Sequence, residues 1–206
     1  MSRYLRPRIR VIRRLGELPG LTKKVTKRSR YPGEHDKRPG TSSDFAIRLE
    51  EKQKLRYNYG LTERQLYNCV KKARRRRGST GVLLLQMLEM RMDNIIHRLG
   101  YTSTIPQARQ LISHGHVFLN NRRAKSPSAV LKKGDKIEVT RIVISPDIIA
   151  NDPQPLGLIA NRRFSSDVPG FLEKNGQSAT VLSTVSREEV GLNINELLVV
   201  EYYSRK

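Results

Sequence analysis

The sequence predicts an α+β fold: a mostly helical amino-terminal domain with a basic extended arm, followed by a module of two helices and a small antiparallel β-unit. Three features of the 206-residue chain predict this fold. Apolar residues recur at helical spacing between residues 45 and 112, alternate with polar residues from 136 to 140, and gather again near the carboxyl end. The last group is too apolar to stay exposed, so we expect it to pack back on the body of the protein.

We expect five segments along the chain: a basic arm over 1–42, a helical domain over 43–90, the helix-and-β module over 91–144, an irregular loop and β region over 145–189, and a carboxyl-terminal segment over 190–206. Prolines and glycines punctuate the irregular region, which leaves room for one or two short strands or turns. Periodicity does not decide between helix and strand for the carboxyl-terminal segment.

The charge of the chain indicates a polyanionic partner. The formal net charge is +21, which favours nucleic acid first and an anionic membrane surface second. Residues 1–40 carry +10, residues 41–90 carry +6, residues 91–145 carry +7 and residues 146–206 carry −2. We therefore expect the partner to contact the first two thirds of the chain. No apolar run reaches membrane-spanning length, and no signal-peptide pattern is present.

Residues 2–40 contain few apolar residues and many turn residues, so this arm alone buries too little surface to offset its ordering entropy. The composition favours a disordered basic arm. The alternative is an arm that orders on RNA, with Tyr4 and Tyr31 stacking on bases and arginines on phosphates. A transit peptide is disfavoured, because the arm is not Ser-rich and Gly16 and Pro19 interrupt any long helix. The phosphate-binding candidates in the arm are Arg3, Arg6, Arg8, Arg10, Arg13 and Arg14.

The first helix of the helical domain is expected over residues 45–59, with Ser43 or Asp44 capping its start and Gly60 ending it. Its predicted inner face consists of Phe45, Leu49 and Leu55. Its predicted solvated face carries two pairs that are each one helical turn apart, Glu50 with Lys54 and Lys52 with Arg56.

The next helix starts at a capping box, Thr62 with Gln65, and carries an apolar stripe of Leu66, Cys69, Val70 and Ala73. The stripe predicts that Cys69 is a core thiol and not a nucleophile. Ser79 or Thr80 then caps a third helix over residues 82–90, which is apolar almost all round and should be buried.

A basic cluster ends the second of these helices. One or two cations would suit the carboxyl-terminal end of a helix dipole. Six exceed that need, so phosphate binding explains them better. The cluster consists of Lys71, Lys72, Arg74, Arg75, Arg76 and Arg77.

The helix-and-β module runs from Arg91 to Thr140. Its first helix should bury Met92, Ile95, Ile96 and Leu99 and end at Gly100. Its second helix should start at a capping box of Thr104 with Gln107, bury Ile105, Ala108, Leu111 and Ile112, and end at Gly115. Asn120-Asn121 predicts a two-residue hairpin turn between strands at 116–119 and 122–124, because Asn tolerates positive φ.

We find no sequence motif for chemistry. The four histidines are His35, His97, His114 and His116, and they lack partners for a metal site. A single cysteine excludes an internal disulfide framework and a cysteine zinc site. No Gly-rich phosphate loop, serine elbow or acid pair with a companion motif is present. We expect no enzyme activity, cofactor, metal or small-molecule substrate, and Asp93 and Asn94 are interpreted as helix-capping residues.

The module resembles the S-four (αL) RNA-binding domain. The resemblance is carried by Arg91, Asp93, Asn94, Arg98, Leu99, Gly100, Ala108, Arg109, Gln110, Leu111, Ile112, Gly115, His116, Val117, Asn120, Gly134 and Asp135. At Asn121 the family usually has Gly. The resemblance implies RNA contacts from Arg91, Arg109, Gln110, His114, His116, Arg122, Arg123 and Lys125.

Residues 2–21, 47–66 and 195–205 extend the resemblance to the whole family of small-subunit ribosomal protein S-four, in its cyanobacterial or plastid form. The region 145–189 matches poorly, and the family's tryptophan before the last block is absent. The resemblance implies a primary binder of small-subunit rRNA at a five-way junction, which nucleates assembly of the subunit body and touches ribosomal protein S-five at a contact linked to accuracy. It also implies a plastid ribosome, with cyanobacterial cytoplasm as the alternative, and no membrane partner. Some members hold zinc through cysteines in the arm, which this chain lacks.

Three other classes of protein share parts of this pattern. An RNA-modifying enzyme or synthetase-like protein with the same module would need a further catalytic domain, for which residues 145–206 are too few. A stress protein of the αL type would lack the amino- and carboxyl-terminal blocks. A DNA-binding helix-turn-helix protein would protect DNA and not rRNA in footprinting.

Overall fold

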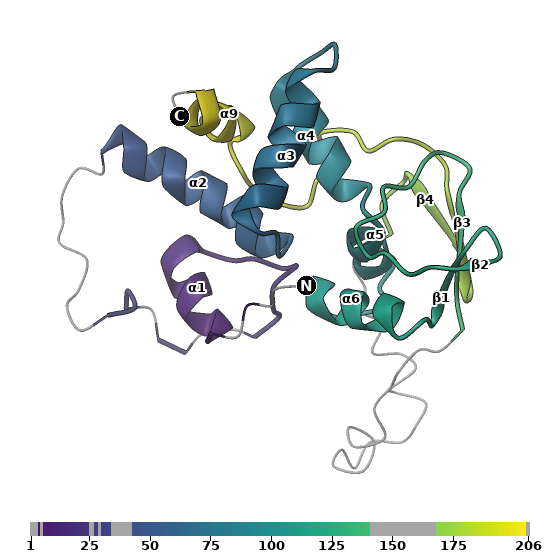
Figure 1. The fold of residues 1–206 in the computed structure, drawn as a ribbon. Helices are drawn as coiled ribbons and strands as arrows, with labels where there is room; N and C mark the ends of the chain where they lie inside the picture. Colours follow the sequence, from purple (N-terminus) through teal and green to yellow (C-terminus); the bar gives the residue numbers. More distant parts are fainter. Residues whose placement is uncertain are drawn as a thin grey trace. The chain divides into compact units, whose positions relative to one another are not determined.

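The computed structural model describes residues 4, 6–24, 27–28, 30–33, 43–140 and 168–204 (Figure 1). The chain divides into two compact units. The helical unit comprises residues 1–89 and 186–206, and the helix-and-β unit comprises residues 90–185. The fold is α+β, as the sequence predicts. Arg3, His35 and most of the irregular region, for which the sequence made predictions, lie outside the described residues.

The helical unit is built from five described helices. They are α1 (Arg8–Leu15), α2 (Asp44–Asn58), α3 (Glu63–Arg74), α4 (Thr80–Glu89) and α9 (Glu196–Ser204). Helix α9 comes from the carboxyl end of the chain and packs against α2, α4 and α3 (Figure 1). It buries Val199 and Tyr203. The carboxyl-terminal segment therefore packs back on the body, as predicted, and the undecided choice between helix and strand is settled as helix.

Part of the arm forms a helix that packs on the helical unit, which corrects the expectation of disorder for the described residues. Helix α1 buries Val11 and Leu15, and the turn after it buries Leu18 and Leu21. The backbone N–H of Gly20 donates to the side-chain oxygen of Asn58, at 2.9 Å. The apolar surface of these four side chains, buried beside α2, stabilises the folded arm, and the composition of the arm alone did not predict this burial.

The predicted inner face of α2 is partly wrong. Phe45 is 60% exposed, whereas Lys52, assigned to the solvated face, is only 4% exposed. The Lys52 ammonium donates to Glu63 at 2.9 Å and lies 4.6 Å from the centre of the Tyr202 ring. Because α9 covers this side of α2, the long stem of lysine is buried while its charge is paired. Leu55 is fully buried, as predicted.

The starts of α2 and α3 follow the predicted caps, whereas those of α5 and α6 differ. The N-cap of α5 is Arg91, without a side-chain cap bond, and not Asp93 or Asn94. Ser43 caps α2, and Thr62 with Gln65 forms a reciprocal capping box on α3. At α6 only half of the predicted box forms. Thr104 accepts from the N–H of Gln107, but the Gln107 side chain accepts from Ser103 instead of Thr104. The extended backbone before this helix brings Ser103 within reach of that amide oxygen.

The helix-and-β unit packs two helices on one face of a five-stranded antiparallel sheet. Its elements are α5 (Met92–Arg98), α6 (Ile105–Ser113), β1 (Val117–Leu119), β2 (Arg122–Arg123), β3 (Lys136–Val139), β4 (Leu172–Asn175) and β5 (Ser178–Val181). The strand order is β2-β1-β3-β5-β4. The register pairs Val117 with Val139 and Ile137 with Ala179, so the buried side chains share one face. The irregular region thus contributes two short strands, in line with expectation.

The hairpin between β1 and β2 turns on two asparagines. Asn120 and Asn121 have φ angles of 48° and 63°, the left-handed values that a two-residue hairpin loop requires. The side chain of Asn120 also joins the hairpin to β3. Its amide donates to Asp135 and its oxygen accepts from the N–H of Lys136, both at 2.9 Å. The predicted turn is confirmed, and Asn120 has a second role that Gly would lack.

Candidate nucleic-acid interface

Asp93, at the start of α5, binds two of the arginines that the sequence assigns to RNA. The Asp93 carboxylate is 1% exposed. Arg91 donates to both of its oxygens, at 3.1 and 2.9 Å, and Arg109 donates to one, at 2.7 Å. The N–H of Asn94 donates to it as well, at 3.0 Å. Arg91 and Arg109 are therefore part of the fold, and an RNA role for them remains a prediction.

The loop that follows β2 is attached to the same end of α5. The N–H groups of Met92 and Asp93 donate to the carbonyls of Ala129 and Pro127, at 2.9 and 3.1 Å. Arg91 forms an isolated β-bridge with Val130. These bonds satisfy two of the N–H groups that a helix leaves unpaired in its first turn. They fix the path of the loop and, with it, the positions of the cations that it carries.

The carboxyl ends of both helices are bound by cations from the sheet. Arg123 on β2 donates to the carbonyls of His114 and Gly115 at the end of α6, at 2.9 and 3.2 Å. Lys174 on β4 donates to the carbonyl of Leu99 at the end of α5, at 2.7 Å. Each cation satisfies unpaired carbonyls at the negative end of a helix dipole. Arg123 is thus partly committed to the fold, although its side chain remains exposed.

Burial perturbs two groups beside the α5 cap. The Lys174 ammonium lies 4.5 Å from the centre of the Tyr101 ring, and burial lowers the pKa of Lys174 below its usual value. Burial also raises the pKa of Tyr101 to about 12, while its hydroxyl donates to the carbonyl of Gly176 at 2.9 Å. Tyr101 is buried, whereas Lys174 is exposed and places its ammonium over the Tyr101 ring. Both side chains link α5 to the β4–β5 hairpin, so their role is structural.

Three further candidates lie around the end of α6. Gln110 and His114 are exposed, and His116 is half-buried. The two imidazole rings are 6.3 Å apart between centres. Because Arg123 reaches the same helix end, the structure brings these four predicted RNA contacts together on one surface.

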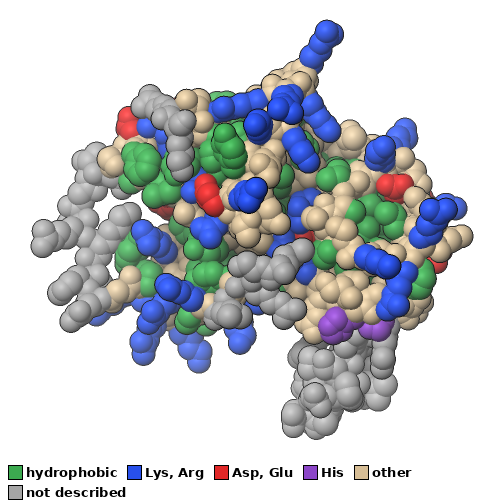
Figure 2. Space-filling view, viewed as in Figure 1, with side chains coloured by type: hydrophobic (Ala, Val, Ile, Leu, Met, Phe, Trp, Pro, Cys, Tyr) green, Lys and Arg blue, Asp and Glu red, His purple; other side chains and the backbone are tan. Residues whose placement is uncertain are grey.

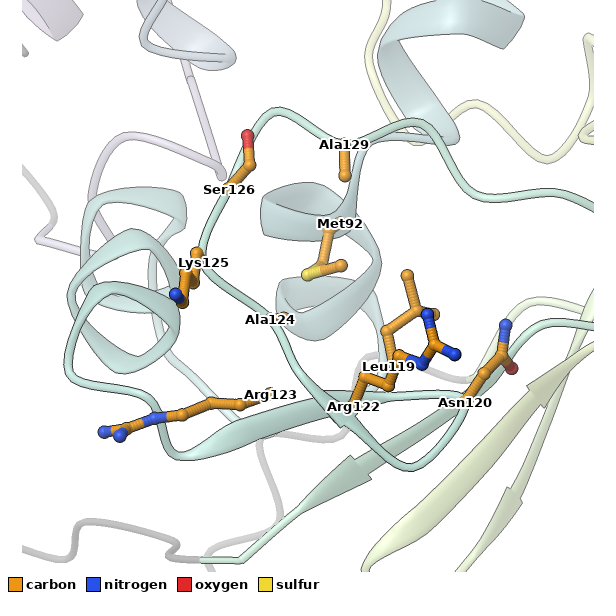
Figure 3. A pocket seen from close by; sticks show the side chains of 9 residues that line it. All are labelled: Met92, Leu119, Asn120, Arg122, Arg123, Ala124, Lys125, Ser126 and Ala129. Carbon is orange, nitrogen blue, oxygen red and sulfur yellow. The ribbon is translucent and has the colours of Figure 1, made fainter.

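Arg122 and Lys125 border a hollow on the surface of this unit (Figure 3). The hollow has a volume of about 680 Å³. Met92 and Ala129 lie on its apolar side, so it is lined by carbon as well as by charge. Among the described residues, neither Arg122 nor Lys125 has an ion-pair or hydrogen-bond partner for its side chain.

The basic cluster of the helical unit is exposed, and Figure 2 shows Lys and Arg side chains projecting at the end of α3. Within the described part of the chain, its only side-chain bond is a long one, from Arg74 to the carbonyl of Val200 at 3.5 Å. The exposed members are Lys71, Lys72, Arg74, Arg75, Arg76 and Arg77. A fold that needed these cations for its own stability would pair them with acids, and it does not.

The arm arginines separate into two groups. Arg13 donates to the carbonyls of Arg30 and Tyr31, and Arg14 lies 5.9 Å from the centre of the Tyr31 ring. Arg8 donates to the carbonyl of Leu21, at 3.3 Å. These three arginines, all on α1, hold the later part of the arm against that helix. Arg6 and Arg10 are exposed and have no ion-pair or hydrogen-bond partner in the part of the chain that the structure describes.

A partly buried polar network fixes the other end of α3. Glu63 accepts from Lys52 and from the hydroxyl of Tyr203, at 2.9 and 2.8 Å. Burial alone raises the pKa of Glu63, but these hydrogen bonds outweigh it and lower the pKa below the usual value. Burial and the Glu63 carboxylate both raise the pKa of Tyr203. The network joins α2, α3 and α9, so it orients the helix that ends in the basic cluster.

Two further kinds of feature are absent from the described residues. No group of three or more His, Cys, Asp or Glu side chains in these residues is placed to hold a metal ion. No helix among them is long and apolar enough to cross a membrane. Cys69 is half-buried on α3.

Three features were not predicted from the sequence. They are the pairing of Asp93 with both Arg91 and Arg109, the cap that Lys174 forms on the end of α5, and the surface hollow beside Arg122 and Lys125. All three depend on segments that are distant along the chain, such as the β4–β5 hairpin and the loop after β2. The alternation of buried and exposed residues gives no signal for them. The one signal available for Asp93 was its acidic character in a stretch where most charged neighbours are basic.

The fold and its exposed cations define a basic α+β protein built from a helical unit and an αL-type RNA-binding unit. The family model described as ribosomal protein S4/S9 N-terminal domain matches residues 3–89, and the S4 domain matches residues 90–137. The chain is 51% identical to small ribosomal subunit protein uS4c of Cyanophora paradoxa, 52% identical to uS4 of Synechococcus elongatus and 50% identical to uS4c of Rhodomonas salina. Each alignment spans 208 positions and covers the whole of both chains. The chain therefore belongs to the uS4 family of small ribosomal subunit proteins, among its plastid and cyanobacterial forms.

Proposed function

We propose that this protein is a structural component of the small ribosomal subunit that binds small-subunit rRNA through cations exposed on both of its units. The observation that carries the proposal is the set of cations that the fold does not use. The basic cluster at the end of α3 and the pair Arg122 and Lys125 are exposed and lack acidic partners among the described residues. Unpaired cations in such numbers are suited to a phosphate backbone.

The mechanism of binding is neutralisation of phosphates with release of counterions. Lys and Arg side chains contact the backbone around a folded RNA junction, and few bases are read directly. Arg91 and Arg109 contribute mainly by fixing α5 and α6, because Asp93 holds both guanidinium groups. The direct contacts in the helix-and-β unit are assigned to Gln110, His114, His116, Arg122, Arg123 and Lys125.

The finer parts of the proposal rest on the family resemblance. The target is a five-way junction of the rRNA, bound early so that the body of the subunit assembles around it. The carboxyl-terminal third, which has a net charge of −2, serves protein contacts, including one with ribosomal protein S-five that affects decoding accuracy. The place of action is the plastid ribosome, and the role is structural, without catalysis.

Salt dependence tests the mechanism. If about six to ten phosphates are neutralised, affinity for small-subunit rRNA should fall roughly 10³- to 10⁵-fold between about 50 and 200 mM salt. Filter binding over a salt series measures this fall, and chemical footprinting of the same complex locates the site. A flat salt response contradicts phosphate binding. Protection scattered along the rRNA, and not confined to one junction, contradicts a specific structural role.

A matched pair of triple variants tests the basic cluster. Replacing Arg75, Arg76 and Arg77 with Ala should lower the slope of log affinity against log salt by about 2 to 3, at the rate of just under one per lost phosphate contact. The control replaces Lys132, Lys133 and Lys136, three exposed cations that the proposal does not use, and should leave the slope nearly unchanged. Equal effects of the two triple variants would show that only net charge matters.

A further inference from the structure

The hollow beside the β1–β2 hairpin has an apolar floor that phosphate binding does not need (Figure 3). Its apolar lining consists of Met92, Leu119, Ala124 and Ala129. Met92 and Ala124 are buried beneath it, whereas Leu119 and Ala129 are only half-buried, so the carbon surface that remains open to solvent is mainly theirs. An anion is held by donors and positive charge and gains little from such a floor. The flat face of an unstacked base is bound by surfaces of this kind.

Cations stand at the rim of the same hollow. Arg122 lies opposite Leu119 in the hairpin register, which places it beside the apolar floor. Lys125 lies three residues further on, on the other side of Ala124 (Figure 3). Both are exposed, and neither is ion-paired with any described residue. A phosphate attached to a base on the floor would therefore meet positive charge at the edge.

The polar groups around the hollow leave little capacity to read a base edge. The Asn120 amide is committed to Asp135 and Lys136. The hydroxyl of Ser126 lies 3.1 Å from that of Ser128, and Arg123 is held on the end of α6. Recognition here would depend on shape and apolar contact, which every base can supply.

We infer that this hollow binds one unpaired, unstacked nucleotide of the RNA, with the base against Leu119 and Ala129 and the phosphate at Arg122 and Lys125. The volume of about 680 Å³ lies within the usual range for pockets that hold a ligand of this size. The inference rests on the proposed function and deepens it. Most of the surface grips phosphates of folded RNA, whereas this site requires a base that has left its helix, with little preference for which base.

Methyl NMR on the full chain, with ¹³C-labelled Ala and Met, tests the inference directly. The probes are a mixed-sequence single-stranded RNA hexanucleotide, a duplex of the same length and inorganic polyphosphate. A base on the floor should move the Ala129 methyl resonance upfield through its ring current. We expect this shift with the single strand and not with the duplex or with polyphosphate, because only the single strand offers a free base face.

A filled hollow provides the matching variant. Ala129→Leu keeps the backbone carbonyl that accepts from Met92 but occupies the floor with a larger side chain. Affinity for the hexanucleotide should fall about 10-fold, the order expected when one base loses its contact surface. Ala46→Leu, the same change at an exposed position of α2, should leave it unchanged. If Ala129→Leu fails to fold, Arg122→Ala serves instead, and it should weaken hexanucleotide binding and reduce the Ala129 shift.

The outcomes separate this inference from the proposed function. Tight, salt-dependent binding of small-subunit rRNA without an Ala129 shift overturns the nucleotide site and leaves the proposed function standing. An equal shift with polyphosphate or with the duplex also overturns it, because the hollow would then be a phosphate site alone. Absence of any binding to rRNA removes the proposed function itself.

Discussion

The guanidinium of Arg123 lies directly against Gly115. A Cβ built on Gly115 would come 1.9 Å from Nε of Arg123, which is closer than any contact the two residues could keep. Gly115 also has a φ of +80°, in the left-handed region that favours glycine. The absence of a side chain at Gly115 is therefore what lets a cation from β2 cap the end of α6.

Gly115→Ala should destabilise the protein twice over, through backbone strain and through displacement of the Arg123 cap. We expect a loss of about 2 to 3 kcal/mol in the free energy of unfolding, from roughly 1 to 2 kcal/mol of strain and about 1 kcal/mol for the cap. Gly134→Ala is the control, because Gly134 has a φ of +88° and nothing within 4 Å of its Cβ position. It should cost the strain alone. Urea unfolding measures both, and equal losses would show that the Arg123 contact contributes nothing.

Asp93→Asn should be strongly destabilising, because it leaves Arg91 and Arg109 without their shared carboxylate in a buried setting. Removal of one partner of a buried ion pair costs on the order of 3 to 5 kcal/mol. Arg109→Ala should cost less, since Arg91 still pairs with Asp93. This expectation differs from the role that the family resemblance implies for Arg109, which is a contact with RNA. Calorimetry of the two single variants and the double variant gives the coupling energy, and a coupling near zero would contradict the pairing of Asp93 with Arg109.

Tyr203→Phe should alter the acid dependence of stability. The folded-state pKa of Glu63 is lowered, so its contribution is present above the usual pKa of 4.5 and is lost as the pH falls through the lower folded value. Without the Tyr203 hydroxyl the Glu63 pKa moves back toward normal. Because Glu63 is partly exposed and its interactions are screened by solvent, we expect the variant to be only about 0.5 to 1 kcal/mol less stable near neutral pH, with the difference shrinking below about pH 4.5. Tyr202→Phe is the control, and urea midpoints over a pH series would refute the idea if the two variants behaved alike.

The two hairpin asparagines should respond in opposite directions to glycine. Asn121→Gly relieves a φ of 63° and should stabilise the protein by a few tenths to about 1 kcal/mol. Asn120→Gly relieves similar strain but removes two hydrogen bonds to Asp135 and Lys136, and should destabilise by about 1 kcal/mol. Thermal melting of the two variants gives the signs. The same sign for both would mean that the Asn120 side chain does not join the hairpin to β3.

Much of the fold was readable from local sequence, because the signals are local in origin. On α5, the stripe of Met92, Ile95, Ile96 and Leu99 is fully buried. At the start of α3, Thr62 and Gln65 form the predicted capping box. The Asn-Asn turn also formed as predicted. Such features depend on side chains within a few residues of one another, so periodicity and turn chemistry are enough to find them.

The positions of the cations in the candidate site were predictable from sequence, but which of them pair with groups of the fold was not. Counting cations located the basic cluster after α3 and the cations of the hairpin. The count of cations does not show which side chains are paired. Arg91 and Arg109 bind Asp93, and Arg13 and Arg123 bind backbone carbonyls. Arg122 and Lys125 have no partner among the described residues. That distinction depends on Asp93 and on helix carbonyls, which reach the same place only after folding.

By itself the sequence determined the helices from α2 to α6, the caps of α2 and α3, the hairpin and the sign of the partner's charge. Tertiary structure decided which positions are covered and which cations are left to bind. Lys52 is buried and Phe45 exposed because α9, from the far end of the chain, packs on one side of α2. Arg123 is an internal cap, and not only an RNA ligand, because Gly115 has no side chain to exclude it. Burial and ion pairing are properties of pairs of segments, and a single stretch of sequence does not contain its partner.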